Sequence, residues 1–119
     1  MSVCERRTDD AAAARLAAGI ASYGLGVGQN EILEGGRGSA QAAFARQVAM
    51  YLCHTAFELS LARVAVAFER DRSTVAHACH SIEDRRDEPQ FDHWMGSLET
   101  MLRDAPAPGR RNWGSDGKP

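Results

Sequence analysis

Residues 60–82 read SLARVAVAFERDRSTVAHACHSI, and the spacing of their apolar side chains decides the fold. The stretch has two halves, each with apolar residues at positions i, i+3, i+4 and i+7, which is the spacing of one helix face. Those residues are Leu61, Val64, Ala65 and Phe68 in the first half and Val75, Ala78, Cys79 and Ile82 in the second. A short polar break at residues 69–71 separates the halves. Two short helices joined by such a turn form a helix-turn-helix motif.

Polar side chains of the same stretch indicate what the motif contacts. Ser60 and Asp71 are favourable N-cap residues at the expected start of each helix. The second helix of a helix-turn-helix lies in the major groove of DNA. Its side opposite the apolar stripe carries short or cationic groups that can reach base edges and phosphates, namely Arg72, Ser73, Ala76, His77 and His80. The stretch therefore predicts a DNA-binding module.

The overall composition is that of one small globular domain. The chain has 119 residues, 44% of them hydrophobic and 25% charged, and its formal net charge is −2. Any positive potential that binds DNA must therefore be local, and nonspecific affinity should be modest. The cations are 13 arginines and one lysine, which favours forked contacts with phosphate and guanine.

No metal, cofactor or catalytic set is expected, so the chain is not expected to be an enzyme. Cys53 and Cys79 fall in helical segments and are expected to be small buried hydrophobes. His77 and His80 share a helix but lack a third zinc ligand. Because the chain has neither an apolar run of membrane-spanning length nor a signal peptide, we expect a cytoplasmic, nucleoid-associated protein with no membrane partner.

The remaining pattern predicts an all-α fold, a compact bundle of about five to six helices. Residues 1–7 are expected to be disordered, residues 8–104 to form a single domain, and the Pro/Gly-rich residues 105–119 to be a disordered tail. Further helices are expected from Thr8 or Asp9 to Gly24, as a single turn at 30–33, from a cap at Ser39 to about residue 57, and from Pro89 to about residue 103. The second helix of the motif should run to about Arg86.

Two features of the C-terminal half of the chain are expected to have structural roles. The residues Phe91, Trp94, Met95, Leu98 and Leu102 form an amphipathic stripe that is expected to be core. The charge run Glu83-Asp84-Arg85-Arg86 is expected to be a solvated helix end, from which Arg85 can reach phosphate.

Three pieces of the sequence together resemble a known family. Residues 46–52 read RQVAMYL, residues 60–61 read SL, and residues 68–78 read FERDRSTVAHA. The succession resembles the C-terminal DNA-binding domain of the bacterial chromosomal replication initiator DnaA, whose motif runs RQxAMYL, SL and FGGRDH[ST]TVxHAxxKI. The spacing agrees to within one residue, and the resemblance covers roughly residues 11–103.

The resemblance implies a set of contacts with double-stranded DNA. Arg46 would contact the DNA backbone and nearby groove, Arg70 phosphate, and Asp71 a cytosine amino group. Ser73 and Thr74 would meet thymine methyls and phosphate, and His77 the groove wall or phosphate. Auxiliary contacts are expected from Arg37, Ser60 and His80.

The chain also departs from the family motif. Glu69 alone stands where the family has Gly-Gly, Arg72 replaces a His, and Ser81 replaces a Lys. Arg72 would favour guanine or phosphate and shift base preference. The family's basic arm is reduced to Arg37, which should lower the electrostatic part of the affinity.

Two functions follow as expectations. The first is sequence-specific binding of double-stranded DNA at initiator-box-like sites, in the regulation of replication initiation or of transcription. The chain has no GxxxxGK[ST] loop, so ATPase activity and a nucleotide cofactor are not expected. The alternative is a regulator that binds the replication initiator or its regulatory proteins and relies little on DNA.

Overall fold

The computed structural model describes residues 2–34 and 39–105, and this part of the chain contains six helices and no strand. The helices are α1 (Val3–Leu25), α2 (Gln29–Glu34), α3 (Ala40–Thr55), α4 (Leu61–Phe68), α5 (Arg72–Arg85) and α6 (Pro89–Asp104). The predicted all-α fold of five to six helices is therefore confirmed. Among these helices none combines the length and apolar character that crossing a bilayer requires.

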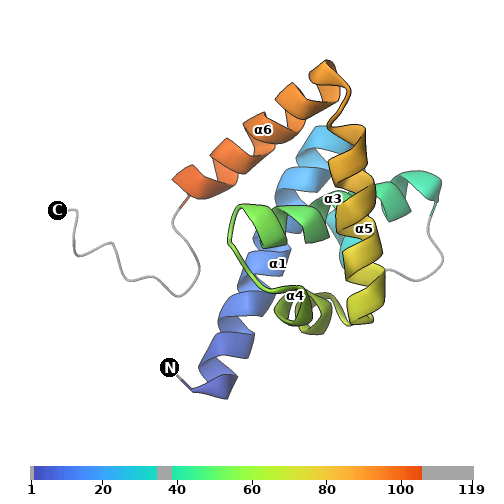
Figure 1. The fold of residues 1–119 in the computed structure, drawn as a ribbon. Coiled ribbons are helices and arrows are strands. Elements are labelled where there is room, and N and C mark those ends of the chain that lie inside the picture. Colours follow the sequence, from blue (N-terminus) through green and yellow to red (C-terminus); the bar gives the residue numbers. More distant parts are fainter. Residues whose placement is uncertain (1, 35–38, 106–119) are drawn as a thin grey trace, which may run out of the picture.

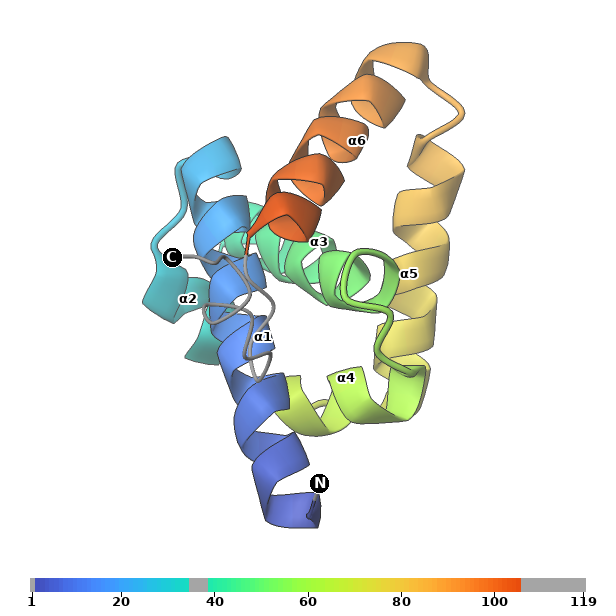
Figure 2. The same cartoon turned by 90° about the vertical axis from the view of Figure 1, so that its left-hand side faces the viewer.

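Helix α3 lies at the centre of the bundle, with α1 on one side and α5 on the other (Figures 1 and 2). Helix α4 crosses near one end of α1 and leads into α5, while α6 lies at the opposite end and packs on α1 and α3. Half of α3 is buried, on more than one face: Ala42, Ala45, Val48, Ala49, Met50, Tyr51, Leu52 and Cys53. A helix that is apolar on most sides must be covered by others, and here it is.

Helix α1 begins at Val3, so the prediction of a frayed start before Thr8 or Asp9 is wrong. Ser2 Oγ accepts a hydrogen bond from the Glu5 backbone N–H at 3.1 Å, and Glu5 Oε1 accepts one from the Ser2 N–H at 2.8 Å. This capping box satisfies two donors at the helix start, and its hydrogen bonds lower the pKa of Glu5. The helix ends at Leu25, one residue beyond the predicted stop, because Gly26 adopts the left-handed conformation with φ of 69°.

The buried face of α1 consists mainly of alanine, at Ala13, Ala14, Ala17, Ala18 and Ala21. Alanine leaves little side chain between two helix backbones, so α1 packs closely on α3. Near the end of α1, a Cβ atom at Gly24 would lie 3.1 Å from the ring of Trp94 in α6. A glycine at this position therefore lets α6 approach.

The other sequence predictions for helices α2 to α6 are confirmed with small shifts of their ends. Ser39 and Ser60 cap α3 and α4, and α6 begins at Pro89 with Glu88 as its cap. In the stripe of α6, Met95, Leu98 and Leu102 are buried, while Phe91 and Trp94 are half-buried against the core. The expected role of this stripe as core is correct.

Cys53 and Cys79 are buried, as predicted, and Cys4 is exposed. Burial raises the pKa of the Cys53 thiol strongly and that of Cys79 to about 11. Both groups therefore stay protonated at neutral pH and act as small apolar side chains.

An ion pair that the sequence did not reveal joins α1 to α4. Asp10 is 6% exposed, and its two carboxylate oxygens accept hydrogen bonds from Arg63, at 2.7 Å from Nη2 and 3.0 Å from Nε. The pair raises the pKa of Arg63, chiefly through the hydrogen bond to Asp10. Because Arg63 lies in the first helix of the helix-turn-helix, this bidentate contact fixes that helix on α1.

A second network joins α3, the end of α5 and α6 through Arg86. Its guanidinium donates to Tyr51 Oη at 3.1 Å and pairs with Glu99 at 3.0 Å and Asp92 at 2.5 Å. Tyr51 in turn donates to Glu83 at 2.7 Å. Burial would lower the pKa of Arg86, but these hydrogen bonds outweigh it and raise the pKa, whereas burial and Glu83 raise the pKa of Tyr51 to about 12.

The charge run at residues 83–86 is therefore not a wholly solvated helix end, as the sequence suggested. The Arg86 side chain is 19% exposed and that of Glu99 is 9% exposed. Thr55 Oγ1 donates a further hydrogen bond of 2.7 Å to Glu99, so this buried carboxylate is satisfied.

The turn after α4 is a Schellman motif. The Arg70 N–H donates to the Ala65 carbonyl at 2.9 Å and the Glu69 N–H to the Val66 carbonyl at 3.2 Å. Glu69 occupies the left-handed position, with φ of 55°. Glycine usually fills that position because a Cβ atom there is strained.

We predict that Asp10→Ala destabilises the protein by about 1–2 kcal/mol, because it removes two charge-assisted hydrogen bonds to a half-exposed arginine. Urea unfolding followed by circular dichroism measures the change. Asp9→Ala is the matched control, since it removes a neighbouring carboxylate without a hydrogen bond to Arg63. Equal effects of the two variants would show that only the net charge matters.

We also predict that Glu69→Gly stabilises the protein by about 0.5–1 kcal/mol, since relief of the left-handed strain exceeds the added chain entropy of glycine. Thermal unfolding measures this change. Glu69→Ala loses the same carboxylate but keeps the strained Cβ atom, so it should give no gain. A gain of the same size in Glu69→Ala would assign the effect to charge.

Candidate nucleic-acid interface

The helix-turn-helix is formed by α4, the Schellman turn and α5. Val64 and Phe68 of α4 and Val75, Ala78 and Ile82 of α5 are buried. Because this apolar side of α5 faces α3 and α4, the opposite side must face solvent. The predicted motif and its buried stripes are present.

The exposed residues at the start of α5 are those that the sequence singled out. Asp71, Arg72, Ser73, Thr74 and His77 are all exposed and lie within the N-cap and first turns of one helix. Asp71 occupies the N-cap with extended backbone angles, but its side chain makes no capping hydrogen bond. Its carboxylate therefore remains available to an external donor.

Arg46 lies on α3, and the structure gives it a contact that sequence reasoning missed. Its Nε donates to the Ile32 carbonyl at 2.9 Å and its Nη2 to the Glu31 carbonyl at 3.3 Å. These carbonyls lie in the last turn of α2, so Arg46 holds α2 against α3. Burial, and then the charge of Arg70, lower the pKa of Arg46.

The three auxiliary residues have different positions. Arg37 lies outside the described residues. The hydroxyl oxygen of Ser60 accepts the Arg63 N–H at 3.2 Å as the N-cap of α4. His80 is exposed on α5, and its Nε2 lies 3.5 Å from Asp84 Oδ2, one turn further along the helix.

Arg85 is exposed at the end of α5, and its guanidinium stacks on two aromatic rings. Its guanidinium lies over the ring of Phe44 at 4.5 Å and over that of Phe91 at 4.8 Å. This cation–π contact connects the end of α5 with α3 and α6. Arg85 thus contributes to packing at the end of α5 while it remains exposed.

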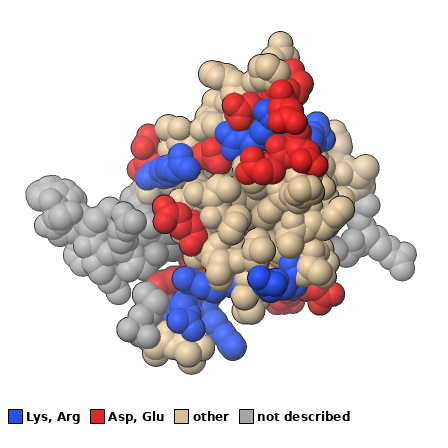
Figure 3. Space-filling view, viewed as in Figure 1, with Lys and Arg blue, Asp and Glu red and all other residues tan. Residues whose placement is uncertain are grey.

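Charge is unevenly distributed on the face shown in Figure 3. Arginine side chains gather at the lower end, over α4 and the N-terminal half of α1, while acidic and basic groups mix at the upper end near the start of α6. The middle of the face is largely uncharged. Positive charge is therefore local, as the net charge of −2 requires.

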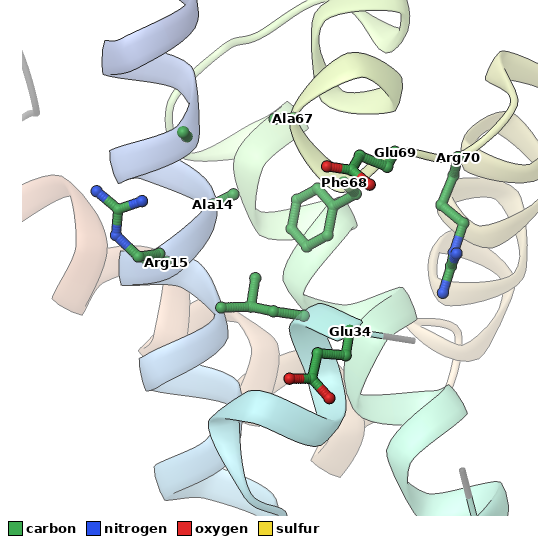
Figure 4. Close-up of a pocket in the computed structure, with 9 residues that line it drawn as sticks. Ala14, Arg15, Glu34, Ala67, Phe68, Glu69 and Arg70 are labelled. Carbon is green, nitrogen blue, oxygen red and sulfur yellow. The ribbon is translucent and has the colours of Figure 1, made fainter. Parts of the chain in front are cut away.

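A hollow of about 460 Å³ opens beside the turn, between α1, the end of α2 and the end of α4 (Figure 4). The ring of Phe68 projects toward its centre, with Glu69 and Arg70 at one side and Glu34 at the other. Its lining residues are Ala11, Ala14, Arg15, Leu33, Glu34, Ala67, Phe68, Glu69 and Arg70. The mixed charges around it do not single out an anionic or a cationic ligand.

Comparison with known proteins gives one consistent result. The family model described as the bacterial dnaA protein helix-turn-helix matches residues 20–82. The chromosomal replication initiator protein DnaA of Aquifex aeolicus is 42% identical over 62 residues, which cover 50% of this chain and 16% of that protein. The protein DnaA 1 of Chlamydia pneumoniae is 40% identical over 76 residues, or 64% of this chain and 16% of that protein.

A solved structure agrees with these matches. The crystal structure of a DNA replication initiation factor superimposes with a TM-score of 0.72 at 31% identity, covering 82% of this chain and 30% of that one. The chain spans about one sixth of the length of the curated relatives it matches. Since the family model covers more than half of the chain and the fold agrees, the protein belongs to the bacterial DnaA helix-turn-helix family.

Proposed function

We propose that the protein binds double-stranded DNA sequence-specifically through α4 and α5, and that it acts in the regulation of replication initiation or of transcription. The observation that carries this proposal is the exposed row at the start of α5, from Asp71 to His77, on a helix of the DnaA helix-turn-helix family. The buried stripe of α5 leaves this row toward solvent, where a major groove can receive it.

The proposed contacts divide into phosphate and base contacts. Arg46 and Arg70 are proposed to contact phosphates, which their guanidinium groups match in charge and hydrogen-bonding geometry. The uncapped carboxylate of Asp71 suits a cytosine amino group, which is a donor. Ser73 and Thr74 can meet thymine methyls and phosphate, and His77 the groove wall.

Auxiliary contacts are proposed for residues at the edges of this surface. Ser60 uses its oxygen lone pairs in capping α4, so its hydroxyl hydrogen remains available for a phosphate oxygen. His80 lies nearly one turn beyond His77 on α5. Arg37, outside the described residues, is proposed as an auxiliary contact because it is the nearest cation before α3 in the sequence.

The proposed activity is recognition without catalysis. The 119 residues contain no GxxxxGK[ST] phosphate-binding loop, so we include no ATP hydrolysis and no nucleotide cofactor. Binding to chromosomal DNA would place the protein at the nucleoid. Initiator-box-like sites are the proposed DNA partner because the motif at residues 46–78 resembles that of the replication initiator.

A second candidate is a regulator that binds the replication initiator or its regulatory proteins. The net charge of −2 and the internal hydrogen bonds of Arg46 and Arg63 favour it, because they reduce the positive charge available to DNA. A variant with Ser73, Thr74 and His77 all changed to Ala distinguishes the candidates. Full cellular activity of that variant would favour protein binding, whereas loss of activity would favour DNA reading.

We predict that an initiator-box duplex binds at least tenfold more tightly than a scrambled duplex of the same composition at one stated salt concentration. Fluorescence anisotropy titration measures both affinities. The triple alanine variant should bind the box duplex more weakly and discriminate less between the two duplexes, because three of the proposed contacts are lost. Equal binding of the two duplexes by the unchanged protein would refute sequence-specific reading.

We predict that Arg46→Ala weakens binding to all duplexes and lowers the slope of log K against log salt by about one unit, because one phosphate contact is lost. Anisotropy titrations at several salt concentrations measure the slope. Arg103→Ala, which removes an exposed cation from α6, is the control and should leave the slope unchanged. A variant that is less stable but keeps the full slope would show that Arg46 only holds α2.

A further inference from the structure

Arg72 differs from the other arginines of α3, α4 and α5 because its guanidinium has no partner within the described part of the protein. Arg46 donates to two carbonyls of α2, and Arg63 is held by both oxygens of Asp10. Arg85, the other arginine of α5, is stacked over two aromatic rings. Within residues 2–34 and 39–105, Arg72 forms no hydrogen bond, ion pair or ring contact.

The position of Arg72 brings this available group to the end of α5 that enters a groove first. Arg72 is the first residue of α5 and is exposed. The buried residue Val75, one turn later, fixes the rotation of the helix, so the start of α5 is held in place. In helix-turn-helix proteins, residues at the start of the second helix contact base edges.

The neighbours of Arg72 favour a base over a phosphate as its partner. Asp71 lies directly before it, and its carboxylate is neither capping the helix nor paired with a cation in the described part of the chain. A phosphate bound by the Arg72 guanidinium itself would also lie close to that negative charge. Base edges carry no net charge, so they can accept from Arg72 while Asp71 accepts from an amino group nearby.

The chemistry of the exposed row assigns guanine to Arg72. Guanine presents two acceptors, O6 and N7, in the major groove, and the arginine fork matches both. Ser73 and Thr74 each offer a single hydroxyl, and His77 offers a single ring N–H in a given direction. None of them can make the bidentate contact.

We propose that Arg72 is the specificity-determining residue of α5 and reads one guanine of the bound duplex through N7 and O6. The proposal rests on the proposed DNA-binding function and adds to it the base that this chain selects and the residue that selects it. A family member with histidine at this position would lack the fork, so the box preferred by this chain should differ at that base pair.

Replacing guanine by 7-deazaguanine, which lacks the N7 acceptor, tests the contact directly. The duplex is the one that this chain binds most tightly among initiator boxes carrying each of the four base pairs at every position. Each of its guanines is replaced in turn, and affinities are measured by anisotropy at one salt concentration. For the unchanged protein, one replacement should weaken binding roughly tenfold. For Arg72→Ala and for Arg72→Lys, which keeps the charge but not the fork, the same replacement should change binding less than twofold.

The control variant is Arg103→Ala, which should keep the full response to that replacement. If Arg72→Ala weakens all duplexes equally, lowers the salt slope by about one unit and keeps the 7-deazaguanine response, Arg72 contacts phosphate and the proposal is overturned, while the DNA-binding function stands. If the unchanged protein does not distinguish box from scrambled DNA, the guanine contact of Arg72 and the proposed sequence-specific binding are both refuted. Circular dichroism confirms that each variant is folded.

Discussion

The burial of α3 is the constraint on which the positions of the other helices depend. Val48 and Leu52 are fully buried, and alanines on its other sides are buried as well. A helix with so little polar surface has to be covered by α1 and α5, and these two helices supply its main neighbours. Once α5 covers α3 with its apolar stripe, its polar side can only face solvent. The direction of the candidate DNA-binding surface thus follows from core packing.

The fold was predictable where the chain encodes it locally. The spacing of apolar residues predicted α4 and α5. The starts of α3, α4 and α6 were indicated by Ser39, Ser60 and Pro89. The start of α1 was missed although its signal was present, because Ser2 and Glu5 have the spacing of a capping box. The missed contacts were those between distant residues. Asp10 and Arg63 are 53 positions apart, and no periodic pattern links them.

The candidate site shows the same division. The exposed row from Asp71 to His77 could be predicted, because helical spacing alone separates it from the buried stripe. The sequence could not predict which arginines are available to a ligand, because it shows which side chains are charged but not which of them have partners inside the protein. Arg46 lies beside the carbonyls of α2 and Arg86 among three helices, and only the packed structure shows that these groups have internal partners. Counting arginines therefore overestimates the charge available to DNA.

Internal engagement of arginines is consistent with the proposal that a chain of net charge −2 reads DNA selectively. Charges used within the protein add little to nonspecific attraction for a polyanion, because their fields are partly cancelled by their partners. The N-cap and first residue of α5 carry one carboxylate and one guanidinium side by side, at Asp71 and Arg72, and both residues are exposed. Because the two charges are opposite, such a pair attracts phosphates little. Its hydrogen bonds to base edges depend strongly on direction. The arrangement favours discrimination over affinity.

The turn between α4 and α5 shows why a departure from the family motif need not change this geometry. Glu69 stands where the motif has two glycines, yet both Schellman hydrogen bonds are formed, from Arg70 to Ala65 and from Glu69 to Val66. These bonds set where the chain leaves α4 and hence where α5 begins. The shorter turn thus retains its hydrogen bonds and accepts a left-handed glutamate instead of a glycine. The departure costs conformational strain of about 1 kcal/mol, while the exposed side of α5 remains positioned by its buried stripe.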